Sequence, residues 1–191
     1  MSKKRLSVID LLVSREFRVL SDLENRMIVA GSGTWDCTFN QFIQYMSTIG
    51  CSVDKNTLIS QYCSYSKLSQ EQLEAAGGVS YDDFICFIDK KYQISMEELD
   101  LSTIDTFASN NALAIYTDVE NIWHTVTPLS AGKITMNGEE VYGIWVWDPS
   151  KENPKERQYF VPNESVAKLY HYNPTEDFGK PGYYGCGGYG Y

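Results

Sequence analysis

A regular apolar stripe predicts a helix that begins near residue 38. From there to residue 49, apolar side chains recur at intervals of three and four residues, the spacing of one face of an α-helix. These positions are Phe39, Phe42, Ile43, Met46 and Ile49. Gly50 follows at once, and glycine is the residue that most often ends a helix because it adopts a positive φ without strain. We therefore expect a helix over 38–49 with one buried face.

Other helices are predicted from local start signals. Residues 8–29 have helical periodicity with a break near Ser21, and 56–65 form a further helical segment. Serines that precede acidic or amide side chains predict helices after Ser69 and Ser80, and the pair Gly77-Gly78 separates these two. The same pattern at 95–98 predicts a helix that runs toward Phe107.

The second half of the chain has the signals of β-structure, and all six prolines lie there, at or after Pro128. The segments with strand character are 112–117, 123–127, 133–136, 139–147 and 158–161. Asn137-Gly138 suits a type I′ turn, which predicts a hairpin between the third and fourth of these segments. Asn163 is expected to cap a helix that continues through His171.

These patterns predict one α+β domain, in which N-terminal helices pack on a C-terminal antiparallel sheet. A chain of 191 residues suits a single domain with additional terminal segments. We assign 31–172 to the domain and 1–30 to an N-terminal helical arm. Residues 173–191 form a tail that is rich in glycine and tyrosine and has no propensity for a regular element.

Composition and charge narrow the classes of partner. The net charge of −9 and the pI near 4.7 would repel a phosphate surface, so we expect no nucleic-acid partner. No apolar run approaches the about 18 residues of a membrane span, and Ser7 and Asp10 interrupt the only candidate for a signal-peptide core. We therefore expect a cytoplasmic protein with no membrane span and no nucleic-acid partner, and its oligomeric state stays open.

The cysteines and histidines argue against a metal site, and we expect no organic cofactor either. The five cysteines are Cys37, Cys51, Cys63, Cys86 and Cys186, and no two have CxxC spacing. Because there are only two histidines, a Cys/His metal site is not expected, and reduced thiols are the default in a cytosol. A calcium loop with Gly77 at its sixth position would have Asp83 at its twelfth, but it lacks enough oxygen ligands at its front positions. A metal-free helix–loop–helix is the better interpretation there.

Cys37, His124 and Asp148 stand where the groups of a cysteine nucleophile would stand. A nucleophilic thiol needs an imidazole base and a third group that orients the imidazole. Cys37 lies at the head of the striped helix, where the unpaired backbone N–H groups favour a thiolate. His124 lies in a predicted strand and Asp148 ends the strand that returns from the hairpin, so adjacent strands can bring the two side chains together.

The same segments resemble the bacteriocin-processing peptidases, which are papain-like domains that cleave double-glycine leader peptides and are often attached to ABC exporters. Asp36-Cys37, the helix with Met46 and the run 49–53 are similar to the nucleophile helix of that family. Residues 112–115, His124 in its strand and the Asp-Pro at 148–149 resemble the later motifs. The resemblance implies a papain-like fold, with Cys37 as the nucleophile, His124 as the base and Asp148 as the group that holds the imidazole.

Two features depart from the pattern of that family. Thr38 stands where the family usually has a glycine, and 30–34 lacks the upstream glutamine that helps to form the oxyanion hole. The nearest glutamine is Gln41, which lies downstream. Loss of one oxyanion donor typically reduces the rate by about 10²–10³-fold. The resemblance thus fits an active peptidase with another donor, or an inactive domain that binds peptides.

Other interpretations of the same residues stay open. Cys37 also fits a small buried residue, His124 a core histidine, and Asp148-Pro149 a strand-ending turn. The rival function is that of a non-enzymatic interaction protein in a bacterial or phage assembly. Such a protein would use its acidic surface and the tail at 173–191, whose tyrosines make adaptable contacts. A third hypothesis is a degenerate EF-hand-like helical module fused to a β unit.

Overall fold

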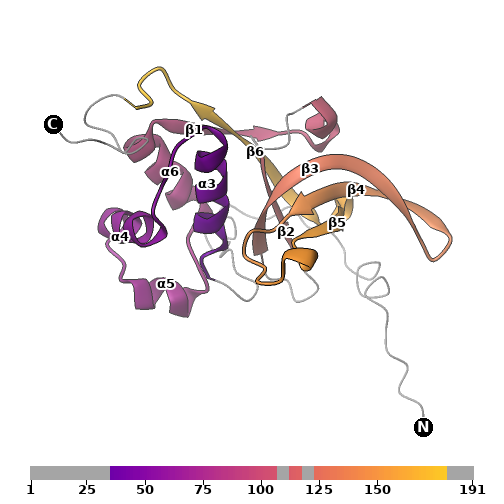
Figure 1. Cartoon of the computed structure of the whole chain (residues 1–191), viewed down its shortest axis with the longest axis horizontal. Helices are drawn as coiled ribbons and strands as arrows, with labels where there is room; N and C mark the ends of the chain where they lie inside the picture. Colours follow the sequence, from indigo (N-terminus) through magenta and orange to yellow (C-terminus); the bar gives the residue numbers. More distant parts are fainter. Residues whose placement is uncertain (1–34, 107–111, 118–122, 180–191) are drawn as a thin grey trace, which may run out of the picture.

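The computed structural model describes residues 35–106, 112–117 and 123–179 (Figure 1). The predicted arm at 1–30 and the end of the tail lie outside these residues. The α-helices of the described part are α3 (Cys37–Thr48), α4 (Lys55–Ser66), α5 (Gln70–Ala76) and α6 (Tyr81–Tyr92). The strands are β1 (Ile94–Leu99), β2 (Ala112–Thr117), β3 (Trp123–Met136), β4 (Glu139–Trp147), β5 (Gln158–Pro162) and β6 (Val166–Pro174). Short 3₁₀ helices are η1 (Leu101–Thr106), η3 (Pro154–Glu156) and η4 (Asn163–Ser165).

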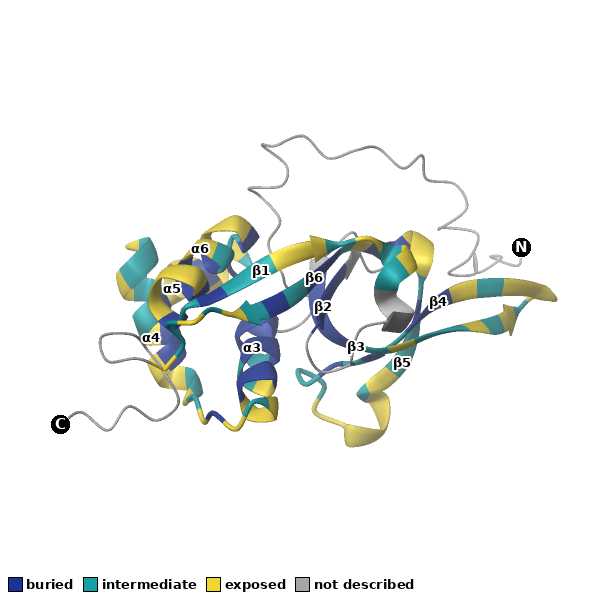
Figure 2. Cartoon of the chain, turned by 90° about the horizontal axis from the view of Figure 1, so that it is seen from above, coloured by how far each residue is buried: buried dark blue, intermediate teal, exposed yellow. Residues whose placement is uncertain are grey.

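The strands form one antiparallel sheet in the order β1-β6-β2-β3-β4-β5. Helices α4, α5 and α6 gather at the β1 end of the sheet, while α3 stands closer to its middle (Figure 1). Seen from above, β4 and β5 lie at the opposite end of the molecule from α4 and α5 (Figure 2). The chain is therefore α+β with its helices before its sheet, as predicted.

An aromatic core joins the helices to the β1–β6–β2 half of the sheet. Phe42 makes edge-on ring contacts with Phe84 at 5.8 Å and with Tyr92 at 5.1 Å, and Tyr45 stacks on Tyr172 of β6 at 4.2 Å. Burial of each large apolar side chain stabilises the fold by about 1.5–3 kcal/mol, and favourable ring geometry adds to this. Since this core lies on one side of α3, it fixes how the helix meets the sheet.

Most of the apolar stripe that predicted α3 lies on the buried face of that helix, while Ile43 and Ile49 are only partly buried. Phe39, Phe42 and Met46 are fully buried. Gly50 has a φ of +79°, and the N–H of Cys51 donates to the carbonyl of Met46 at 2.9 Å, which closes the helix end. The prediction from residue spacing and the terminal glycine was therefore correct.

The predicted helical pair around Gly77-Gly78 is also confirmed. Ser69 and Gln72 form a reciprocal capping box at the start of α5, and both glycines have positive φ, at +79° and +140°. Gln72 lies inside α5, so it cannot belong to a loop that wraps a cation. The front positions of the calcium-loop alternative are helical, and that alternative does not fit the backbone of these residues.

The hairpin between β3 and β4 has the predicted turn. Asn137 and Gly138 have φ angles of +53° and +88°, as a type I′ turn requires, and Met136 pairs with Glu139. A register shift between Pro128 and Ser130 bends β3 between its two halves. Residues 123–126 of β3 pair with β2, and the strand pairs with β4 from Thr127 to Met136, on both sides of the bend.

Two predicted helices are strands in the structure. Residues 94–99 form β1, which pairs with β6 over its whole length, and only the short η1 follows it. Residues 166–174 form β6 after the single 3₁₀ turn η4. In both cases a capping-like pattern was outweighed by long-range pairing, and in β6 also by the burial of alternate side chains such as Tyr170 and Tyr172.

Candidate catalytic site

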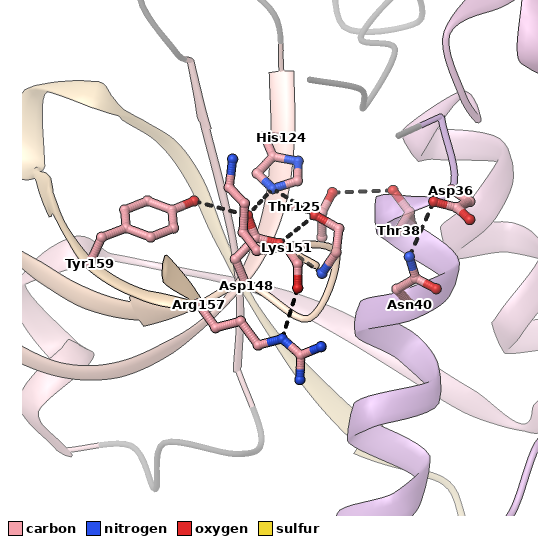
Figure 3. Close-up of polar contacts among 10 residues, drawn as sticks. Asp36, Thr38, Asn40, His124, Thr125, Asp148, Lys151, Arg157 and Tyr159 are labelled. Carbon is pink, nitrogen blue, oxygen red and sulfur yellow. Dashed lines mark hydrogen bonds and ion pairs between the residues drawn. The ribbon is translucent and has the colours of Figure 1, made fainter. Parts of the chain in front are cut away.

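A buried bond between His124 and Asp148 lies at the centre of the candidate site. Nε2 of His124 is 2.6 Å from Oδ2 of Asp148, and neither side chain is exposed to solvent (Figure 3). The register explains the contact, because Thr127 of β3 pairs with Trp147 of β4 and Asp148 directly follows that pair. The expectation that adjacent strands would bring these two side chains together is correct.

The carboxylate of Asp148 is held by groups that the sequence did not single out. Oδ1 accepts hydrogen bonds from both the backbone N–H and the hydroxyl of Ser150, and Oδ2 accepts one from the Tyr159 hydroxyl at 3.3 Å. Burial alone would raise the pKa of Asp148, but the hydrogen bonds and charge of His124, together with Ser150, keep that pKa below its usual value. Asp148 is therefore ionised and fixed in orientation.

Cys37 approaches the same imidazole from the helical half of the molecule. It is the first residue of α3, and it is fully buried. Burial would lower the pKa of His124, but hydrogen bonds to Asp148 and to Cys37 outweigh it and raise that pKa to about 9. Asp148 contacts Nε2 of the ring, and Cys37 also raises the pKa of the same imidazole. The structure thus brings the three predicted residues together.

A pair of threonines connects the two elements that carry Cys37 and His124. Oγ1 of Thr38 on α3 lies 3.1 Å from Oγ1 of Thr125 on β3, and both residues are fully buried. Each threonine directly follows one of the two candidate catalytic residues. The hydrogen bond therefore fixes the separation between the start of α3 and β3 at the site.

Polar contacts also hold the residue before Cys37. The Asp36 carboxylate accepts a hydrogen bond from the Asn40 amide at 3.1 Å and forms an ion pair with Lys55 at the start of α4. As a result, the Asp36 side chain makes no capping hydrogen bond to the first turn of α3. The N–H groups of that turn keep their partial positive charge toward the site.

Gln41 does not supply the missing oxyanion donor in this structure. Its amide nitrogen donates to the Thr127 hydroxyl at 3.3 Å, and its amide oxygen accepts from the Tyr172 hydroxyl at 2.6 Å. The side chain is fully buried within this bridge between α3, β3 and β6. Gln41 therefore has a structural role, and the departure of the chain from the family pattern stands.

Tyr81 is a further buried polar group near the site. Its hydroxyl has no hydrogen-bond partner among the described residues, and its side chain is almost fully buried at the start of α6. Burial raises the pKa of Tyr81 far above its usual value, and nearby Tyr172, Tyr170 and Cys37 add to this. No sequence pattern marks this residue, because its significance depends on the packing of α6 beside α3.

A solvent-open groove of about 570 Å³ runs along the face of α3 that the core leaves uncovered. Its lining residues are Asn40, Ile43, Gln44, Ser52, Val53, Asp54, Lys55, Pro149 and Arg157. They come from α3, the start of α4 and the segment between β4 and β5. The groove thus lies between the helical half and the sheet half, one turn along α3 from Cys37.

The described cysteines differ in oxidation state. Cys37, Cys63 and Cys86 have free thiols, whereas Cys51 is bonded in a disulfide. The expectation that all thiols are reduced therefore fails at Cys51. Cys37 is the one free thiol of the described part that is buried beside a histidine.

Among the described residues, no helix is long and apolar enough to cross a membrane.

Comparison with known proteins identifies no relative of this chain. No protein-family model matches the sequence, and no characterised protein matches it either.

Proposed function

We propose that this chain is a cysteine peptidase of the papain-like, leader-processing type, or an inactive relative that binds the same kind of peptide. The observation that carries the proposal is the buried His124–Asp148 bond of 2.6 Å together with the contact of Cys37 on the same imidazole. A thiol, an imidazole and an orienting carboxylate are the groups that nucleophilic acyl transfer requires. The order of these residues and the α+β architecture support the same proposal.

In the proposed reaction, the Cys37 thiolate attacks the carbonyl carbon of a peptide bond and forms a tetrahedral intermediate. His124, as an imidazolium, donates its proton to the leaving amine, which departs as the C–N bond breaks. Water then attacks the resulting thioester, His124 accepts the proton of the water, and the carboxylate product leaves Cys37 as a thiolate. Asp148 stabilises the imidazolium and fixes its ring orientation throughout.

The first turn of α3 is the proposed source of oxyanion stabilisation. Its backbone N–H groups are not capped by the Asp36 side chain, and the helix dipole adds positive potential at the same point. These donors would act in place of the glutamine that the family pattern has upstream. This replacement is what separates an active peptidase from an inactive one.

The site is closed in the described state, because Cys37 and His124 are both fully buried. A peptide can reach the Cys37 sulfur only after the residues that cover it move. A small alkylating reagent is therefore a better first probe of the thiol than a peptide substrate.

Alkylation of Cys37 by iodoacetamide between pH 5.5 and 8 tests the proposal when it is followed by peptide mass mapping. A thiolate–imidazolium pair predicts a rate that changes little over this range and falls at least tenfold in His124→Ala. Exposed Cys86 in the same molecule reports how an exposed thiol responds to pH. If the Cys37 rate rises with pH as the Cys86 rate does and is unchanged in His124→Ala, the peptidase proposal is wrong, and the interaction-protein alternative gains.

A further inference from the structure

Arg157 is held in place by its own loop. It follows η3 and directly precedes β5. Its Nε–H donates to the carbonyl oxygen of Lys151 at 2.8 Å, and its guanidinium lies 5.7 Å from the ring of Trp147. Figure 3 shows the side chain extending from beneath Asp148 toward α3. These two contacts orient the guanidinium of a residue that lines the groove.

The terminal nitrogens of Arg157 have no carboxylate partner in the described part of the chain. The ion pairs between other side chains there join Lys55 to Asp36, Lys133 to Glu140, and Lys168 to Glu98. A half-buried guanidinium without an acid is notable in a chain with a net charge of −9. Arg157 lines the groove, so the missing partner fits a group that enters from solvent.

The rest of the groove is suited to a peptide. Asn40 and Gln44 line it with amides that can both donate to and accept from a peptide backbone. Both residues are on α3, and at a rise of about 1.5 Å per residue they lie about 4.5 and 10 Å along the helix from Cys37. Once the residues that cover Cys37 move, a chain of a few residues that is anchored at Arg157 would span the distance to the Cys37 sulfur.

We propose that Arg157 binds a carboxylate of the peptide substrate, from an acidic side chain or from a C-terminus, while the groove along α3 holds the neighbouring residues. This inference rests on the proposed function, because it names the substrate class of the same site. The fork of guanidinium donors matches a carboxylate with two parallel hydrogen bonds. Lys55 does not serve equally well, since its ammonium is already paired with Asp36.

NMR titration of the full-length Cys37→Ala protein tests this binding without any reaction. The probes are Ac-Ala-Glu-Ala-Ala-NH₂, its Gln counterpart, and Ac-Ala-Ala-Ala-Ala with a free C-terminus. The Arg157 Nε–H and the Trp147 indole N–H are the reporting signals. We expect the Glu peptide or the free-carboxylate peptide to shift both signals and to bind about tenfold more tightly than the Gln peptide. Which of these two peptides binds identifies the source of the carboxylate.

Substitutions at Arg157 and at a matched control complete the test. Arg157→Gln should abolish the preference for a carboxylate, and Arg157→Lys should keep part of it, because lysine retains the charge but loses the fork. Lys155→Gln removes the same charge from the same loop but does not touch the groove, so it should have no effect.

Two results would overturn the inference: equal binding of the Glu, Gln and free-carboxylate peptides, including no binding of any, or an equal loss in Lys155→Gln and Arg157→Gln. If Arg157→Gln fails to fold, the comparison of peptides on the Cys37→Ala protein still decides. Carboxylate binding in a protein whose Cys37 proves unreactive would remove the peptidase proposal alone. A reactive Cys37 without carboxylate binding would remove only the role of Arg157.

Discussion

Thr38 and Thr125 are joined by a buried hydrogen bond of 3.1 Å, and they are the residues that directly follow Cys37 and His124. The bond therefore connects the helix that carries the proposed nucleophile to the strand that carries the proposed base. It also gives a physical reason for the threonine at position 38, where the peptidase family that the sequence resembles usually has glycine. A glycine at this position could not bond to the Thr125 hydroxyl.

Replacement of either threonine by valine should destabilise the protein. Thr125→Val leaves the Thr38 hydroxyl buried without a partner, which lowers the free energy of unfolding by about 1–3 kcal/mol. Thr38→Val should act in the same way. The double variant should be more stable than the sum of the single effects predicts, because it removes both polar groups together. Urea unfolding of the four proteins measures this coupling, and additive effects would contradict it.

The local signals that gave correct predictions are those that tertiary contacts do not change. The stripe of α3 and its terminal Gly50 describe a single helix face, and Asn137-Gly138 fixes a turn by backbone preference alone. Ser95 shows the opposite case. Its hydroxyl donates to the carbonyl of Asn173 on β6 at 3.2 Å, so it does not cap a helix. The pairing that recruits it involves residues almost eighty positions away, which no local pattern records.

The residues of the candidate site also fall into those that local sequence patterns predict and those that they do not. Cys37, His124 and Asp148 could be proposed because each lies in or at the end of an element that the sequence predicts. Ser150 and Arg157 could not, because their contacts depend on how the segment between β4 and β5 folds back. There the N–H of Asp148 donates to the Arg157 carbonyl at 2.7 Å, which closes the segment. Sequence spacing does not predict that closure.

Asp148→Asn should lower the pKa of His124 below about 9, because it weakens the hydrogen bond and removes the charge of Asp148, which together with Cys37 outweigh the effect of burial. NMR titration of the histidine ring protons measures the change. His171 is the second of the two histidines, and its signal should not respond to the substitution. Tyr159→Phe is a matched control that removes one long hydrogen bond to the same carboxylate oxygen and should cause a much smaller shift. An unchanged His124 midpoint in Asp148→Asn would show that Asp148 does not set this pKa.

The buried pair of His124 and Asp148 should make the free energy of unfolding depend on pH. The pKa of His124 rises from 6.5 to about 9 on folding, so its contribution is fully present below pH 6.5 and is lost as pH rises toward 9. The pKa of Asp148 is lowered from 3.8, so its contribution is present above pH 3.8 and is lost as pH falls further. The two contributions coincide between pH 3.8 and 6.5.

Urea unfolding of the wild type and of His124→Gln at a series of pH values measures this dependence. Between pH 6.5 and 9 the difference in unfolding free energy should shrink, by at most about 1.4 kcal/mol per pH unit for the one proton involved. A difference that stays constant over that range would mean that His124 is not charged in the folded protein at neutral pH.

Gln41→Leu should lower the free energy of unfolding by about 2–4 kcal/mol, because it leaves the hydroxyls of Thr127 and Tyr172 buried without Gln41. The structure gives Gln41 no part in oxyanion stabilisation, so alkylation of Cys37 in the folded variant should proceed as in the wild type. Unfolding and alkylation measured on the same preparation separate the two effects. Little loss of stability with a large loss of peptide hydrolysis would instead place Gln41 in the oxyanion site.

Tyr81→Phe should change the free energy of unfolding in the direction opposite to Gln41→Leu. The Tyr81 hydroxyl is buried without a hydrogen-bond partner in the part of the chain that the structure describes, so its removal should raise the free energy of unfolding by about 1 kcal/mol or more. Tyr172→Phe is the matched control, because Tyr172 is equally buried but donates to Gln41, and its loss should destabilise the protein. Thermal or urea unfolding of the wild type and of the two variants gives the comparison.

A folded protein tolerates an unpaired buried hydroxyl such as that of Tyr81 most readily where function requires it. If the gain in stability is accompanied by slower alkylation of Cys37, the Tyr81 hydroxyl takes part in the site. If Tyr81→Phe is destabilising by as much as Tyr172→Phe, the hydroxyl has a partner in solution and both conclusions fail.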